Sequence, residues 1–193
     1  MFRSTVPFFA INNIKMYSNS AIESFINHNH SFLQLKTRLN KINCNDKFKK
    51  LVQPQITSFK DTFSINDIDN LRLLVNRENA NINFNNFGYY KHTFYYSDIL
   101  NANLIVWGPN AKTNIHIHPE NGCFIYNIYG IWKEDLYNST SFNNNNTTKK
   151  TKTSYYHSGR ILFIDDEIGA HQVTNLSHNS YALSLNIYSP NEL

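Results

Sequence analysis

Two histidines of the chain are spaced so that both could bind a single metal ion. His116 and His118 flank Ile117 in a stretch where apolar and polar residues alternate. On a β-strand, residues i and i+2 point to the same face, so the two imidazoles would project together. His28 and His30 share this spacing, but they lie in a polar stretch predicted to be helical, where such side chains diverge. The pair at 116 and 118 is the better candidate, although two ordinary surface or core histidines would give the same pattern.

A third histidine follows downstream in a recognisable arrangement. Cys123 is followed seven residues later by Gly130, and His171 lies much further along with Asn175 four positions after it. Together with the His-x-His pair, these residues resemble the two signature motifs of the cupin superfamily. Cupins are small jelly-roll β-barrels, so the resemblance implies a mainly β fold of that type, with the predicted N-terminal α-helices packed outside. Most metal-binding cupins carry a glutamate where this chain has Cys123.

The cysteine at that position points to one family within the superfamily. The chain resembles cysteine dioxygenase in these short segments: Trp107-Gly108, His116-Ile117-His118, Cys123-Phe124, Gly130, Lys133-Glu134, 168–171 and 184–190. The resemblance implies that His116, His118 and His171 hold one ferrous iron. It also implies that a thioether bond links Cys123 to Tyr188 beside the metal. The residues alone leave open that Cys123 is an ordinary buried thiol.

Three imidazole ligands without a carboxylate suit the chemistry of that family. Neutral imidazoles bind iron, zinc, copper or nickel and leave the full 2+ charge on the ion. Such a site favours an incoming thiolate, because a coordinating thiol loses its proton. Three ligands on one face of an octahedron leave positions for the substrate sulfur, the substrate amine and dioxygen. We therefore expect an iron-dependent oxidoreductase that adds dioxygen to L-cysteine and yields cysteine sulfinic acid.

Two positions depart from the family pattern. The family has an arginine that clamps the substrate carboxylate, where Lys91, preceded by Tyr89, offers only a point charge. Misalignment would instead make Lys91 a surface residue. Ser184, Asn186 and Tyr188 share one face of the last predicted strand, but the family has a histidine where Asn186 stands. Asparagine keeps a donor and an acceptor, yet it does not titrate near neutral pH.

These departures keep alternative functions open. The same chemistry could act on another small thiol, such as mercaptopropionate or cysteamine. A cupin that binds a metal or a small molecule without catalysis is the second alternative. The expected catalytic residues are Tyr188, Cys123, Ser184 and Asn186, and the expected substrate-binding residues are Lys91 and Tyr89.

The elements that must position these residues fall into two parts of one predicted domain over 1–193. Residues 1–87 form a helical part, with helical periodicity from about 22 to 79, Ser64 as an N-cap with Asp67 three residues later, and Pro54 separating two helices. Residues 88–193 follow a period of two, which predicts an antiparallel barrel. The expected strands cover 104–107, 114–118, 123–133, 159–164, 171–176 and 181–189, with a long surface loop over 138–153.

Composition excludes several other classes of protein. The chain has 193 residues, 41% of them hydrophobic, which is enough for a core and argues against global disorder. Its formal charge of +4 comes from scattered lysines and arginines, so we expect neither a nucleic-acid nor a membrane partner. Two cysteines make no disulfide framework. We expect a cytoplasmic monomer whose partners are a small thiol and dioxygen.

Overall fold

The computed structural model describes residues 20–43, 47–118, 121–138, 149–165 and 167–189. Four helices come first, followed by one short 3-10 turn: α1 (Ser20–His28), α2 (His30–Leu39), α3 (Phe48–Thr62), α4 (Ile65–Glu78) and η1 (Asn79–Asn81). Eight strands follow: β1 (Tyr89–Tyr96), β2 (Asn101–Trp107), β3 (Cys123–Tyr129), β4 (Trp132–Tyr137), β5 (Lys150–Tyr156), β6 (Ile161–Ile164), β7 (Ala170–Asn175) and β8 (Ala182–Tyr188). None of the described helices combines the length and apolarity that a membrane span requires.

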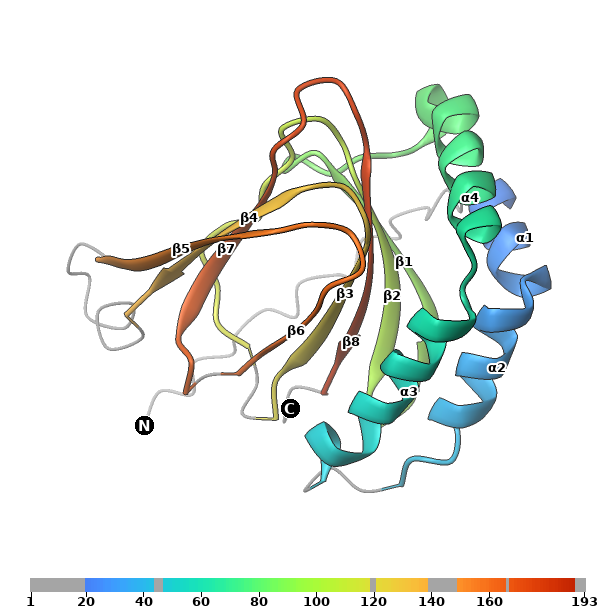
Figure 1. The fold of residues 1–193 in the computed structure, drawn as a ribbon, viewed down its shortest axis with the longest axis horizontal. Helices are drawn as coiled ribbons and strands as arrows, with labels where there is room; N and C mark the ends of the chain where they lie inside the picture. Colours follow the sequence, from blue (N-terminus) through green and yellow to red (C-terminus); the bar gives the residue numbers. More distant parts are fainter. Residues whose placement is uncertain (1–19, 44–46, 119–120, 139–148, 166, 190–193) are drawn as a thin grey trace, which may run out of the picture.

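The strands form two antiparallel sheets that face each other. The larger sheet has the order β1-β2-β8-β3-β6, and the smaller one has the order β5-β4-β7. The helices stand along one face of the larger sheet, away from the smaller sheet (Figure 1). This arrangement confirms the predicted cupin-type jelly-roll barrel with N-terminal helices packed outside.

The larger sheet separates two apolar cores because its side chains alternate between faces. Leu183, Leu185 and Ile187 of β8 point toward the helices and join a core with residues of all four helices. Ile105 of β2 and Ile125 of β3 point the other way, into a smaller core between the sheets. The predicted alternation of β8 is therefore confirmed. Most of the apolar burial lies outside the barrel, which leaves its interior free to hold polar groups.

The helical part confirms one predicted signal and corrects another. Ser64 caps α4 in a capping box with Asp67, as the sequence predicts. Pro54 does not separate two helices, because it lies inside α3. Its ring is exposed, and the helix is held by the burial of Val52 and Ile56 on its other face. The breaks between helices fall elsewhere. Asn29 separates α1 from α2, and its side chain accepts hydrogen bonds from the first turn of α2. Phe63 and Ser64 separate α3 from α4.

Three strand predictions are also corrected. The expected strand over 123–133 is two strands, separated by a turn in which Gly130 has a φ of 107°. Residues 150–153, expected in a loop, belong to β5, while 139–148 lie outside the described residues. The segment 114–118 is not a regular strand. It is held to β7 through an isolated bridge between His116 and His171.

Candidate metal centre and cavity

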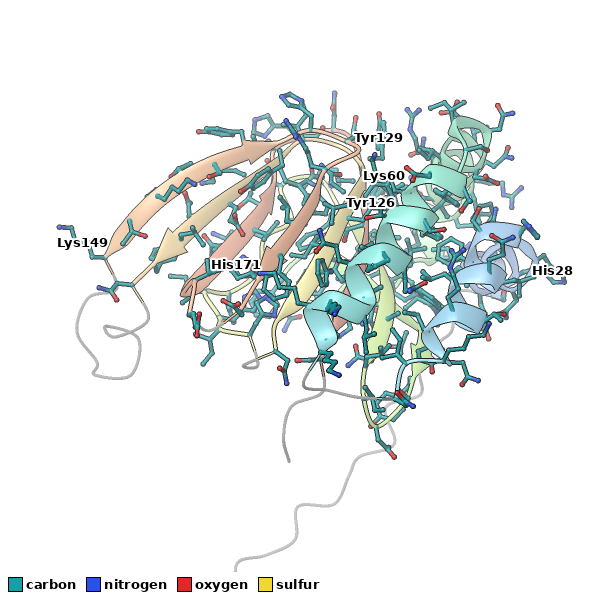
Figure 2. All side chains as sticks on the ribbon, turned by 60° about the horizontal axis from the view of Figure 1, so that its bottom comes forward. His28, Lys60, Tyr126, Tyr129, Lys149 and His171 are labelled. Carbon is teal, nitrogen blue, oxygen red and sulfur yellow. The ribbon has the colours of Figure 1, made fainter. Side chains whose placement is uncertain are left out.

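Three histidines converge on one point inside the barrel. Nε2 of His171 lies 2.9 Å from Nε2 of His118 and 3.2 Å from Nε2 of His116. Two backbone hydrogen bonds between His116 and His171, of 3.0 and 2.8 Å, bring the irregular 114–118 segment beside β7. His171 lies among the strands, well away from α3 where Lys60 is marked (Figure 2). The other pair with this spacing, His28 and His30, is exposed, and the two residues lie on different helices.

The spacing of these nitrogens fits a single metal ion. Ligands at about 2.1 Å from an ion and at right angles to one another would be separated by about 3.0 Å. The two Nε2 distances, 2.9 and 3.2 Å, bracket that value. His116, His118 and His171 could therefore hold one metal ion beside the cavity, since their ligand atoms all lie within 4.8 Å of one another.

The environment of the imidazoles favours the form that binds metals. Burial, together with the neighbouring His171, lowers the pKa of His116, and the same causes lower the pKa of His118 to about 3. Both rings are therefore neutral near pH 7, as metal ligation requires. Nδ1 of His116 lies 2.9 Å from the backbone oxygen of Asn114, and Nδ1 of His171 lies 2.7 Å from a carboxylate oxygen of Glu134. Protons on both Nδ1 atoms leave the Nε2 lone pairs free to face the ion.

The three histidines open onto a cavity of about 290 Å³. This volume lies near the lower end of small-molecule sites, which span roughly 300–1,000 Å³. Its walls are largely apolar and aromatic, with contributions from Phe87, Trp107 and Trp132. A few polar groups border the same space: Tyr89, Lys91, Asn114, Asn186 and Tyr188. The cavity suits a small ligand with one or two polar ends.

A chain of hydrogen bonds runs along β8 toward the metal centre. Nε1 of Trp107 donates to Oγ of Ser184 at 3.1 Å, and Ser184 donates to Oδ1 of Asn186 at 2.7 Å. Nδ2 of Asn186 then donates to the phenolic oxygen of Tyr188 at 3.0 Å. The ring of Tyr188 stacks on His118, with ring centres 5.8 Å apart. Sequence reasoning placed the three β8 residues on one face but missed Trp107, whose indole begins the chain.

Cys123 and Tyr188 are brought together by strand pairing. They lie directly opposite each other in the antiparallel pair of β3 and β8. Side chains of such pairs are neighbours, with Cβ atoms about 4.5–5.5 Å apart. Burial raises the pKa of the Cys123 thiol and that of the Tyr188 phenol well above their usual values. Both groups are therefore protonated near neutral pH.

Both residues expected to bind substrate border the cavity. Lys91 is exposed overall, but its ammonium lies 4.8 Å from the centre of the Tyr188 ring. Partial burial of the ammonium lowers the pKa of Lys91, while the nearby Cys123 acts in the opposite direction. The Tyr89 ring packs against Trp107, with centres 5.3 Å apart. Lys91 is thus a rim residue whose charged end reaches inward.

One neighbour of the metal centre carried no expected role. The sequence contains Glu134 within a segment that resembles the known family, yet nothing local links it to a histidine 37 residues later. Only the pairing of β4 with β7 brings the two side chains together. Predicting the contact between Glu134 and His171 would require the register of β4 and β7, which the sequence does not supply.

Comparison with known proteins supports the interpretation of the site. The sequence model of the family "Cysteine dioxygenase type I" matches residues 49–192. Cysteine dioxygenase type 1 of Rattus norvegicus is 34% identical over 86 residues, which cover 45% of this chain and 42% of the rat protein. The Homo sapiens protein of the same name matches with the same identity and coverage. The matched stretch thus spans less than half the length of these relatives.

The solved structures that match this chain are more distant in sequence. An RmlC-like cupin from Shewanella frigidimarina is 14% identical, with a TM-score of 0.40 over 55% of this chain and 79% of that chain. KdgF from Halomonas is 15% identical, with a TM-score of 0.42 over 59% of this chain and 91% of that chain.

Proposed function

Because the chain belongs to the cysteine dioxygenase type I family, we propose that it is an iron-dependent thiol dioxygenase that oxidises L-cysteine to cysteine sulfinic acid. In this reaction a thiol R–SH and one O₂ give R–SO₂H, so both oxygen atoms end on sulfur. The observation that carries the proposal is the convergence of the three histidines at the edge of a small cavity, with Nε2 of His171 lying 2.9 Å from that of His118 and 3.2 Å from that of His116.

His116, His118 and His171 would hold the iron, and the protein would supply the surroundings. When bound, iron(II) would bring dioxygen and the substrate thiolate together and lower the pKa of the thiol. Trp107 and Trp132 line the cavity with aromatic surface. Tyr188, held by Asn186 at 3.0 Å, presents a phenol beside His118 for a hydrogen bond to the bound reactants. These groups orient the reactants, which is a large part of catalysis when two ligands share one ion.

The charges around the cavity favour a thiol that carries a carboxylate. Among the described residues that line it, Lys91 carries a positive charge and no side chain carries a carboxylate. An anionic end on the substrate would be attracted to this ammonium and to the ion. Cysteamine, which lacks a carboxylate, would gain nothing from Lys91. Mercaptopropionate carries a carboxylate that could pair with the Lys91 ammonium, as that of cysteine could. It is therefore the second candidate substrate.

We further propose that Cys123 and Tyr188 form a thioether. Its formation would join the cysteine sulfur to a ring carbon of the tyrosine and release two protons and two electrons, which dioxygen would accept. Support comes from the direct pairing of these residues across β3 and β8. Mass spectrometry of the peptide pair would detect the loss of two hydrogen atoms. Two separate peptides of unchanged mass, after aerobic turnover, would argue against the bond.

Oxygen consumption by the ferrous protein tests the proposed function. The protein is loaded with iron(II) without air and then mixed with L-cysteine, mercaptopropionate or cysteamine, and the products are identified by mass spectrometry. We expect oxygen uptake matched by cysteine sulfinic acid. Bound iron without uptake for any thiol would favour a cupin that binds a metal or a small molecule without catalysis.

A further inference from the structure

A buried carboxylate lies directly behind one of the three histidines. Glu134 is only 7% exposed, and its Oε1 lies 2.7 Å from Nδ1 of His171. Its other oxygen, Oε2, accepts a hydrogen bond of 3.0 Å from the hydroxyl of Tyr156. A buried charge is costly unless it is paired and hydrogen-bonded, and the two contacts give each oxygen a donor. The three side chains form a continuous path from the outer strand β5 to the metal centre.

The strand register explains why these three side chains meet. Strand β4 lies between β5 and β7, and Glu134 is opposite Ser154 on one side and Val173 on the other. Tyr156 and His171 are each two residues from those partners, so they share the inner face with Glu134. The carboxylate therefore sits between its two diagonal neighbours. This placement is a property of the sheet and does not depend on a flexible loop.

The three histidines are consequently not equivalent as ligands. Nδ1 of His116 faces a neutral backbone oxygen, that of Asn114. Nδ1 of His171 faces a carboxylate, which attracts the Nδ1 proton more strongly and makes the opposite nitrogen, Nε2, a better electron donor. A hydrogen bond from Tyr156 draws charge away from Glu134 and weakens this effect. Burial and the nearby carboxylate keep the pKa of Tyr156 raised, so its hydroxyl remains a donor.

We propose that Glu134 and Tyr156 tune His171 as a metal ligand in opposite directions. Glu134 is a positioning residue that fixes the tautomer of His171 and strengthens its bond to the ion. Tyr156 weakens the bond between His171 and the ion, because its hydrogen bond draws negative charge away from the Glu134 carboxylate. The inference rests on the proposed function only in requiring that His171 binds a metal.

Co²⁺ binding to the metal-free protein tests the role of Glu134 without any turnover. The dissociation constant is measured by competition with a chelator, and the d–d absorption of bound Co²⁺ reports the strength of its ligands. We expect Glu134→Gln, which keeps the shape but removes the charge, to bind Co²⁺ about 10- to 100-fold more weakly. Asp135→Asn is the matched control, because Asp135 is the next residue on β4, is also buried, and pairs with Lys133 at 2.9 Å and with Lys150 instead of with a histidine. It should bind Co²⁺ like the wild type.

The role of Tyr156 is tested by removing its hydroxyl alone. We expect Tyr156→Phe to bind Co²⁺ more tightly than the wild type, by up to about threefold, with its d–d bands displaced opposite to those of Glu134→Gln. Tyr155→Phe is the control, because Tyr155 is the preceding residue of β5 and is 62% exposed. A purely structural role would instead weaken binding in both Glu134→Gln and Tyr156→Phe.

The outcomes separate this inference from the proposed function. Wild-type affinity in Glu134→Gln, or a comparable loss in Tyr156→Phe, would overturn the tuning of His171 while leaving the dioxygenase proposal intact. Opposite effects in the two variants, in a protein that oxidises no thiol, would uphold the inference and refute the function. A wild-type protein that binds neither Co²⁺ nor iron(II) would refute both.

Discussion

Replacing Lys91 by methionine should separate substrates by their charge. The change keeps most of the length of the side chain but removes the ammonium that lies 4.8 Å from the Tyr188 ring at the cavity. If that ammonium binds the carboxylate of cysteine, the variant loses a charge-assisted contact. Cysteamine has no carboxylate and carries a positive charge, so the same variant should treat it no worse than the wild type does.

The size of the effect follows from Coulomb's law and from the position of Lys91. Two unit charges about 4 Å apart interact with roughly 4 kcal/mol at an effective dielectric constant of 20. Lys91 is exposed overall, so solvent screening reduces that value, and about 1.5–2 kcal/mol is appropriate for a hydrogen bond to a charged group. This corresponds to a fall of about 10- to 30-fold in kcat/KM for L-cysteine.

The assay compares kcat/KM for L-cysteine and cysteamine in the wild type, in Lys91→Met and in a control. Lys152→Met is suitable as the control, because Lys152 is exposed on the outer strand β5. The variants should contain equal amounts of iron, so that metal loss does not imitate the effect. An equal loss for both thiols, or no loss for cysteine, would refute the assignment of Lys91 to the carboxylate.

Further changes test the metal centre and the fold. His171→Ala should abolish tight iron binding, because two ligands hold a divalent ion poorly; iron retained in stoichiometric amount by elemental analysis would contradict the three-histidine site. Tyr188→Phe should keep iron but lose any cross-link to Cys123, and loss of iron would mean that Tyr188 has a structural role. Burial lowers the pKa of His118 to about 3, so between about pH 3 and 6.5 the unfolded state binds more protons than the folded state. Acidification in that window should therefore destabilise the metal-free protein by up to about 1.4 kcal/mol per pH unit. Urea unfolding at pH 5 and 7 should show a smaller loss in His118→Gln, and an identical loss would remove His118 as the cause. Ser64→Ala should lower the free energy of unfolding by about 1 kcal/mol through loss of the capping box. Urea unfolding measures this loss, and an unchanged stability would contradict the role of the cap.

Features encoded by neighbouring residues could be predicted from the sequence. The shared face of Ser184, Asn186 and Tyr188 follows from the period of a strand, and the cap at Ser64 follows from spacing within one helical turn. Long-range features could not. Pro54 was predicted to end a helix, but burial of the opposite face of α3 outweighs the local preference of proline.

Strand β5 and the contact of Glu134 with His171 could not be predicted from the sequence. The first residues of β5 are exposed lysines and threonines, so the strand has no apolar alternation and resembles a loop. Its existence depends on pairing with β4 rather than on its own composition. Glu134 likewise meets His171 only through the register of two strands. Both features depend on contacts between segments that are far apart in the chain.

The two cores separated by the larger sheet have a consequence for how this protein can change. The core beneath the helices holds most of the large apolar side chains, and none of the residues that border the cavity is among its fully buried members. Substitutions at Lys91 or Asn186 would therefore alter the cavity without disturbing that core. Natural or laboratory selection could therefore change the residues at these positions, and with them the proposed choice of substrate, without loss of the fold.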